Sequence, residues 1–104
     1  MKCPKHNIDL EYTNTKYGKR YACPECDVVL WEGSTSTPAD YETRQLRRKC
    51  HSLFDKRWKN NRERNDAYTT MAHIMGIKKE KTHFGMFNKE QCEEALKILN
   101  GNYW

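Results

Sequence analysis

The residues best suited to chemistry in this chain are two short pairs of metal-ligand side chains near its start. Cys3 and His6 form a Cys-x2-His pair, Cys23 and Cys26 form a Cys-x2-Cys pair, and 16 residues lie between the pairs. Each pair places two donors on one tight turn, and two such turns can close a tetrahedron around one zinc ion. Because four protein ligands leave no open position for water, we expect one structural Zn²⁺ rather than a catalytic one.

The same residues allow other interpretations, namely ordinary buried thiols, a disulfide framework, or a thioredoxin-like redox pair at Cys23 and Cys26. No apolar signal segment precedes Cys3. We therefore expect a cytoplasmic protein, of a bacterium or of a phage-infected host, where clustered cysteines favour metal binding. A redox pair would need a surrounding strand-helix unit, which the sequence does not predict. Cys50 and Cys92 fall at apolar positions of expected helices and should be core residues.

Short apolar runs around the ligand pairs predict the strands that would position them. The pattern predicts a zinc ribbon at 1–33 with about three antiparallel strands. A ribbon this small buries too little apolar surface to fold alone, so zinc binding would supply folding free energy. Asn7 and Asp27, just after the ligand pairs, are expected to take a left-handed backbone. The expected strands and turn lie at Ile8, Leu10 and Tyr12, then at 14–18, 20–23 and 28–31.

A polar linker at 34–38 is expected to separate the ribbon from a helical region at 39–104, which makes the fold class α+β. The segment 77–87 connects the second and third of the helices given below, and it is too long for the turn of a helix-turn-helix motif. Its aromatic part, 83–87, is expected to be a buried strap between helices. Three helices are predicted: a long basic one from about Pro38 to Lys59 with Thr37 as its cap, one from Asp66 to Met75 ended by Gly76, and one capped by Asn88 and closed by Gly101.

Positive charge is concentrated in one segment of the chain. The formal net charge is +5, and the segment 44–64 holds nine Lys or Arg against two acids, whereas the rest is nearly balanced. Such a segment is either a footprint for polyanions or a well-solvated helix face. The candidate nucleic-acid contacts are Arg44, Arg47, Arg48, Lys56, Arg57, Lys59, Arg62 and Arg64.

Two function classes fit these features. The first is a nucleic-acid-binding module whose basic side chains neutralise phosphates. The second is a protein-interaction adaptor or inhibitor that docks on an acidic partner. No segment is long and apolar enough for a membrane partner. The aromatic side chains of the predicted zinc ribbon could stack on bases or supply the core of the ribbon. They are Tyr12, Tyr17, Tyr21 and Trp31.

An enzyme is the least favoured class. His51 and Asp55 could be combined with His73 or His83 into a nuclease-like site. No spacing among them matches a catalytic signature, and a histidine on a basic helix is more often a surface or packing residue. We therefore expect no catalytic activity.

The chain resembles a family of small, uncharacterised zinc-finger-containing proteins found in bacteria and their phages. The resemblance covers nearly the whole chain, and it implies a zinc ribbon followed by helices and a prokaryotic or phage origin, with no assigned activity. In relatives a cysteine is as usual as His6 at the second ligand position, and neutral imidazole is an equally good zinc ligand. The matching residues are the two ligand pairs, Leu46, His51, Phe54, Asp55, Trp58, Ala67, Tyr68, Ala72, 75–77, 83–87 and Cys92.

Overall fold

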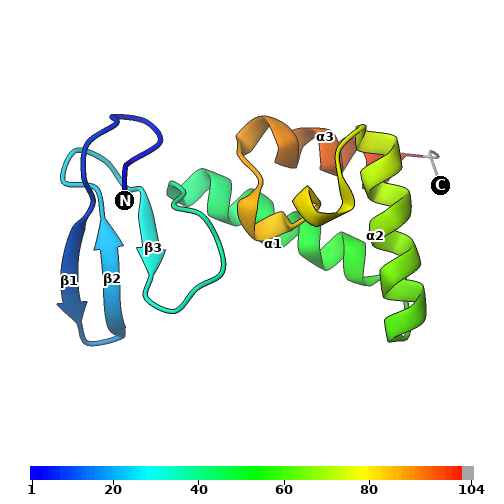
Figure 1. The fold of residues 1–104 in the computed structure, drawn as a ribbon, viewed down its shortest axis with the longest axis horizontal. Helices are drawn as coiled ribbons and strands as arrows, with labels where there is room; N and C mark the ends of the chain where they lie inside the picture. The colour runs from blue at the N-terminus through cyan, green and yellow to red at the C-terminus, as the bar shows by residue number, and fades with distance from the viewer. Residues whose placement is uncertain (102–104) are drawn as a thin grey trace.

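The computed structural model describes residues 1–101, and residues 102–104, the end of the predicted helical region, lie outside the described part. Within residues 1–101 the chain forms a three-stranded antiparallel sheet followed by three α-helices and two short 3-10 helices (Figure 1). This is the α+β arrangement expected from the sequence. The sheet lies at one end of the molecule and the helices at the other.

The sheet is an antiparallel meander in the order β1-β2-β3. Its strands are β1 (Glu11–Thr15), β2 (Gly18–Ala22) and β3 (Val29–Trp31). The predicted turn at 14–18 is too long, because β1 continues to Thr15 and pairs with Gly18, leaving two residues in the turn. Gly18 has a φ of 127°, a backbone region that residues with a Cβ rarely enter, and this allows so short a connection.

Helix α1 (Tyr41–Asp55) begins later and ends earlier than predicted. The predicted cap at Thr37 is wrong, because Ala39 is still extended and pairs with Val29 in an isolated bridge. Asp40 is the N-cap instead, and its side chain accepts a 2.8 Å hydrogen bond from the amide of Thr43. A capping carboxylate satisfies an amide that has no partner inside the helix.

Helix α2 (Asn61–Met75) begins five residues before the predicted start at Asp66, because Asn60 caps it. Its end at Gly76 is confirmed, and Gly76 takes a left-handed backbone with a φ of 69°. For α3 (Lys89–Asn100), the predicted cap at Asn88 and the end at Gly101 are both confirmed. The Asn88 side chain accepts from the amide of Gln91, and the Gln91 side chain accepts from the amide of Asn88.

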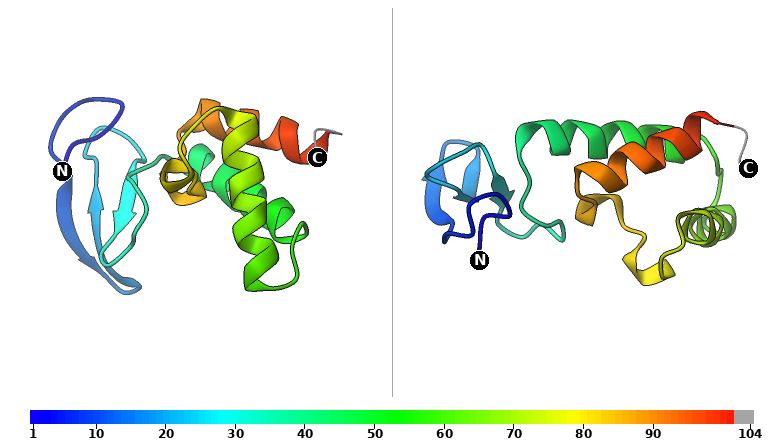
Figure 2. Two further views of the ribbon diagram at one scale, coloured as in Figure 1. Left: turned by 45° about the vertical axis from the view of Figure 1, so that its right-hand side comes forward. Right: turned by 90° about the horizontal axis from the view of Figure 1, so that it is seen from above.

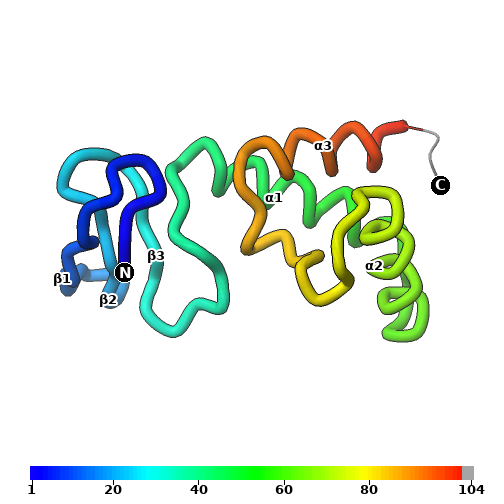
Figure 3. Tube along the Cα trace, turned by 45° about the horizontal axis from the view of Figure 1, so that its top comes forward, coloured from blue at the N-terminus to red at the C-terminus, as the bar shows by residue number. Residues whose placement is uncertain are grey.

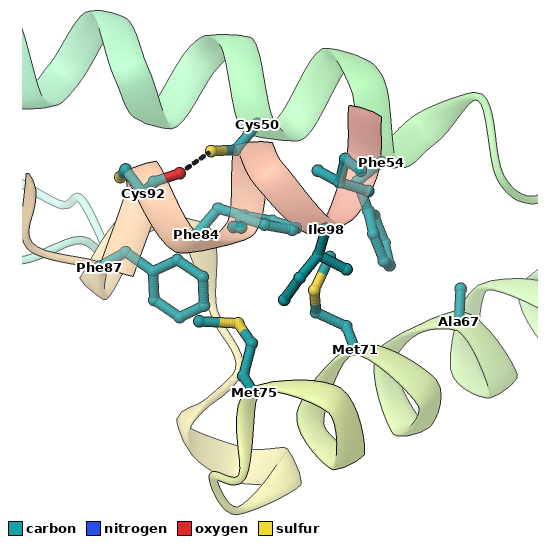
Figure 4. Packing of buried hydrophobic residues seen from close by; sticks show 11 residues of the cluster. Cys50, Phe54, Ala67, Met71, Met75, Phe84, Phe87, Cys92 and Ile98 are labelled. Carbon is teal, nitrogen blue, oxygen red and sulfur yellow. Dashed lines mark hydrogen bonds between the residues drawn. The ribbon is translucent and has the colours of Figure 1, made fainter. Parts of the chain in front are cut away.

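One hydrophobic core joins the three helices, of which α1 and α3 lie side by side (Figure 2). Phe84 and Phe87 are buried in it, so most of the 83–87 segment is the buried strap that the sequence predicted, although Met86 is exposed. These residues lie in and after the 3-10 helix η2 (Phe84–Met86), which follows η1 (Lys79–Lys81). Cys50 and Cys92 are fully buried, and the Cys50 thiol donates to the Cys92 carbonyl at 3.3 Å (Figure 4).

The chain between the sheet and α1 is bonded to both parts of the molecule. After β3 it turns back along that strand before entering α1 (Figure 3). Val29 and Ala39 exchange two backbone hydrogen bonds of 3.0 and 3.3 Å, and the Thr37 amide donates to the Gly85 carbonyl at 3.0 Å. The predicted linker at 34–38 therefore rests against η2 at its end. Among the described helices, none has the length and apolar character needed to span a membrane.

Candidate metal centre

Two turns that share one backbone hydrogen bond present the four predicted metal ligands. In each turn the amide of the first cysteine donates to the carbonyl five residues later, from Cys3 to Ile8 at 2.8 Å and from Cys23 to Val28 at 3.0 Å. Asn7 has the expected left-handed backbone, with a φ of 53°. The same prediction for Asp27 is wrong, since Asn7 is the one non-glycine residue of 1–101 with positive φ.

The four ligand atoms converge as a tetrahedral zinc site requires. The Sγ and Nδ1 atoms of Cys3, His6, Cys23 and Cys26 lie within 4.8 Å of one another. Cys3 Sγ lies 3.6 Å from Cys26 Sγ and 3.7 Å from His6 Nδ1, and Cys23 Sγ lies 3.8 Å from His6 Nδ1. Zn–S bonds of about 2.3 Å and Zn–N bonds of about 2.0 Å in a tetrahedron place neighbouring ligand atoms roughly 3.5–3.8 Å apart. The cluster is therefore suited to hold one zinc ion.

The local electrostatics favour thiolate formation at one of the cysteines. Burial acts to raise the pKa of Cys3, but hydrogen bonds from His6 and from the backbone outweigh it and lower the pKa to about 6. Burial and the neighbouring thiols raise the pKa of Cys26 to about 11. A bound Zn²⁺ would stabilise all three thiolates, so loading would release protons.

The residues beside the ligands attach the site to the start of α1, which sequence reasoning missed. Lys5, between Cys3 and His6, forms a 2.6 Å ion pair with Asp40, and its amine also lies 3.9 Å from Asp27. Asp27, next to Cys26, accepts a 3.1 Å hydrogen bond from the amide of Tyr41. No local signal marks these pairs, because each depends on where the sheet places the turns.

Two of the eight predicted nucleic-acid contacts have structural roles instead. Arg47 is buried, and its guanidinium donates to the Phe87 carbonyl, the Thr37 carbonyl and the Thr37 hydroxyl at 2.8–2.9 Å. The prediction for Arg47 is wrong, because these three bonds turn its guanidinium inward. Arg57 is half-buried and donates to the Leu99 carbonyl at 2.6 Å, near the end of α3.

The other six predicted contacts divide between the two ends of α1. Near the start of α1, Arg44 is half-buried and donates to the backbone of Asp40 and Asp27, whereas Arg48 is exposed. Exposed side chains at the far end of α1 and the start of α2 are Lys56, Lys59, Arg62 and Arg64. Arg64 lies over the rings of Trp58 and Tyr68, at 5.8 and 5.1 Å from their centroids.

The aromatic residues of the sheet divide between surface and core. Tyr12 and Tyr17 are exposed, and Trp31 is partly exposed beside the guanidinium of Arg20. Tyr21 is half-buried against the small core around Cys3, Cys23 and Val28. Only part of the ring set therefore supplies the ribbon core.

Two of the three histidines proposed for a nuclease-like site, His51 and His83, line the same surface cavity. His51 Nδ1 lies 2.9 Å from Asp55 Oδ2, one helical turn later, and its ring packs edge-on against Phe84. His83 lies beside Gly85, and His73 is on the last turn of α2.

Comparison with known proteins agrees with this geometry. A family model described as a zinc-finger-containing domain matches residues 4–102. No curated protein and no solved structure matches the chain. The matched segment contains three of the four ligands and begins one residue after Cys3. With four zinc ligands converging at its sheet and a family match over almost all its length, the chain belongs to the family of zinc-finger-containing domains.

Proposed function

We propose that the protein is a nucleic-acid-binding module in which the zinc centre is structural and the exposed basic residues of the segment 44–64 contact phosphates. The observation that carries the proposal is that three of these basic side chains are exposed and have no internal polar partner among the described residues. Within residues 1–101, the side chains of Arg48, Lys56 and Arg62 form no hydrogen bond and no ion pair. Lysine or arginine pairs with carboxylates in the described part occur at Lys2, Lys5 and Lys89 instead.

The sign and distribution of charge support a polyanionic ligand. The segment 44–64 carries a local charge of +7, from nine basic and two acidic residues. One of those acids, Asp55, already faces His51. Unpaired cations on a helix attract phosphates at long range, and each phosphate contact releases counterions from the nucleic acid.

Salt-dependent binding is the test. The full chain with zinc bound is titrated into a fluorescein-labelled oligonucleotide, and anisotropy is followed at several NaCl concentrations. We expect the affinity to fall steeply with salt, with a slope proportional to the number of phosphates neutralised. Absence of binding at low salt, or affinity independent of salt, would count against the proposal.

An acidic protein surface is the alternative partner for the same cations, as in an adaptor or inhibitor. Capture from a nuclease-treated lysate distinguishes the two partners. Under our proposal the captured material disappears when nuclease is added, whereas a protein partner of an adaptor would survive.

The proposal includes no catalytic step. His51 is paired with Asp55 on a single helix. We treat the pair as part of the binding surface, because Cys3, His6, Cys23 and Cys26 form the one group of metal-ligand side chains found within residues 1–101. Incubation of bound oligonucleotides with the zinc-loaded protein should leave them intact. Cleavage that vanished in a His51→Ala variant would overturn this part of the proposal.

A further inference from the structure

Two surface cavities meet along one side of α1. The first, of about 300 Å³, lies between β3 and the first half of α1, and the second, of about 480 Å³, lies between α2 and the segment that carries η1 and η2. In both ribbon figures that segment lies between α2 and the β3–α1 connection. Both cavities are lined by His51, Phe84 and Gly85. The two cavities therefore adjoin at these three residues, and we name the pair the cross-helix groove.

Gly85 lies where the two cavities adjoin, and its surroundings are closely packed. A Cβ atom at Gly85 would lie 2.5 Å from the Ser36 hydroxyl and 3.0 Å from Cε1 of His83. Any larger side chain would therefore fill the junction. A single strand can follow these adjoining cavities across α1, whereas a double helix is too stiff to bend over so short a distance.

The groove offers both cations and an aromatic ring. Arg48 and His51 lie on one side of α1, three residues apart, and Arg64 projects from α2. The guanidinium of Arg64 lies over the rings of Trp58 and Tyr68, which restricts its motion before any ligand arrives. Trp31, at the β3 end, is partly exposed. Positively charged grooves with aromatic side chains are the usual binding surface for single strands.

We propose that the cross-helix groove binds single-stranded nucleic acid, with phosphates at Arg48 and Arg64 and a base against Trp31. This inference rests on the proposed function and adds the form of nucleic acid and its path across α1. It also makes the zinc ribbon part of the binding surface, because β3 supplies one wall of the groove.

The test compares a labelled single-stranded oligothymidine of about ten nucleotides with a hairpin duplex, by anisotropy with the full zinc-loaded chain. We expect the single strand to bind at least about tenfold more tightly. Neutralisation of the two phosphates, at Arg48 and Arg64, predicts a salt slope of roughly −1.4. Trp31→Ala should weaken single-strand binding about tenfold, as loss of one stacked base does.

A matched pair of variants locates the site. Arg48→Gln removes a groove cation, and Lys49→Gln removes the same charge from the next residue, which is exposed and does not line the groove. We expect Arg48→Gln to weaken binding and to reduce the salt slope by about 0.7, with Lys49→Gln within about twofold of wild type. Gly85→Leu should block the groove without changing its charge. If that variant does not fold, the comparison of Arg48→Gln with Lys49→Gln tests the groove instead.

The outcomes separate this inference from the proposed function. Failure of both oligonucleotides to bind overturns both. Duplex binding as tight as single-strand binding, with equal losses in Arg48→Gln and Lys49→Gln, overturns the cross-helix groove and leaves general nucleic-acid binding in place.

Discussion

Lys5 and Asp40 join the metal site to the helical region through an ion pair of 2.6 Å. Lys5 lies between two zinc ligands in the sequence, and Asp40 caps α1. Asp27, beside a third ligand, adds its hydrogen bond to the amide of Tyr41. The first turn of α1 is therefore held by the two ligand turns, so the zinc ribbon is attached at the same place where the basic helix begins.

Loss of the Asp40 side chain should destabilise the protein in two separable ways. Asp40→Ala removes the cap and the ion pair and should cost about 1 kcal/mol for the cap alone. Asp40→Asn keeps a good capping residue and loses only the charge, so its cost should be smaller. Urea unfolding of both variants measures the difference. An Asn variant as unstable as the Ala variant would show that the charge, not the cap, matters.

The contribution of Asp40 should depend on pH in a defined direction. Burial acts to raise the pKa of this carboxyl, but Lys5 and the Thr43 amide outweigh it and hold the pKa well below the usual range. A depressed pKa gives stability that is present above the unfolded value of about 3.9 and is lost as the pH falls further. The stability difference between wild type and Asp40→Asn should be constant above about pH 5 and shrink below about pH 4. A difference that grows on acidification would contradict this.

Removal of zinc should affect more than the sheet. Structural zinc supplies folding free energy to small ribbons, and here the ligand turns also hold the first turn of α1. We expect a strong chelator to abolish the sheet signals in NMR spectra and to lower the melting temperature of the helical region. Independent melting of the helices, unchanged by chelation, would contradict the coupling.

Cysteine variants should assign the ligands. Cys23→Ser should lose the metal, whereas Cys92→Ser, at a fully buried core position, should retain one zinc per chain. Metal content by atomic absorption on purified protein provides the measurement. Retention of zinc by the Cys23 variant and its loss from the Cys92 variant would contradict the ligand assignment.

The features that could be predicted from the sequence are those that depend on residues only a few positions apart. The Cys-x2-His and Cys-x2-Cys pairs and the Asn88–Gln91 capping box act within a few residues, so spacing alone identifies them. The start of α1 was mispredicted because Thr37 and Asp40 are both good caps. The pairing of Ala39 with Val29, ten residues earlier, selects Asp40.

The role of Arg47 could not be predicted for a similar reason. Its carbonyl partner on Phe87 lies 40 residues away in the sequence. Nothing in the local sequence distinguishes Arg47 from the other basic residues of the segment 44–64. Only the packing of η2 against α1 turns it into a buried donor, and the same packing creates the cross-helix groove from residues that share no motif.

Truncation of Arg47 should therefore be among the most destabilising changes on α1. Arg47→Leu leaves two carbonyls and a hydroxyl without their charged donor, which should cost about 2–4 kcal/mol and lower the melting temperature by roughly 10 °C or more. Arg47→Lys should not restore stability, because an ammonium cannot reproduce the planar fork. Arg48→Leu, at the next and exposed position, is the control and should stay within about 0.5 kcal/mol of wild type. Equal melting temperatures for the two leucine variants would contradict the structural role of Arg47.

The left-handed backbone of Asn7 gives the last prediction, because it lies directly after a zinc ligand. Asn7 has a φ of 53°, and its amide donates to the Cys3 carbonyl at 2.8 Å, which closes the first ligand turn. Glycine enters this region freely, whereas a β-branched residue is strained there by about 1–2 kcal/mol. Asn7→Gly should therefore keep the zinc affinity of wild type, and Asn7→Val should lower it about tenfold, as a change of 1.4 kcal/mol does. Competition with a chromogenic chelator measures both. Asn14→Val, the same substitution in the extended backbone of β1, is the control and should leave zinc affinity unchanged. If Asn7→Val bound zinc as tightly as Asn14→Val, strain at this turn would play no part in holding the metal.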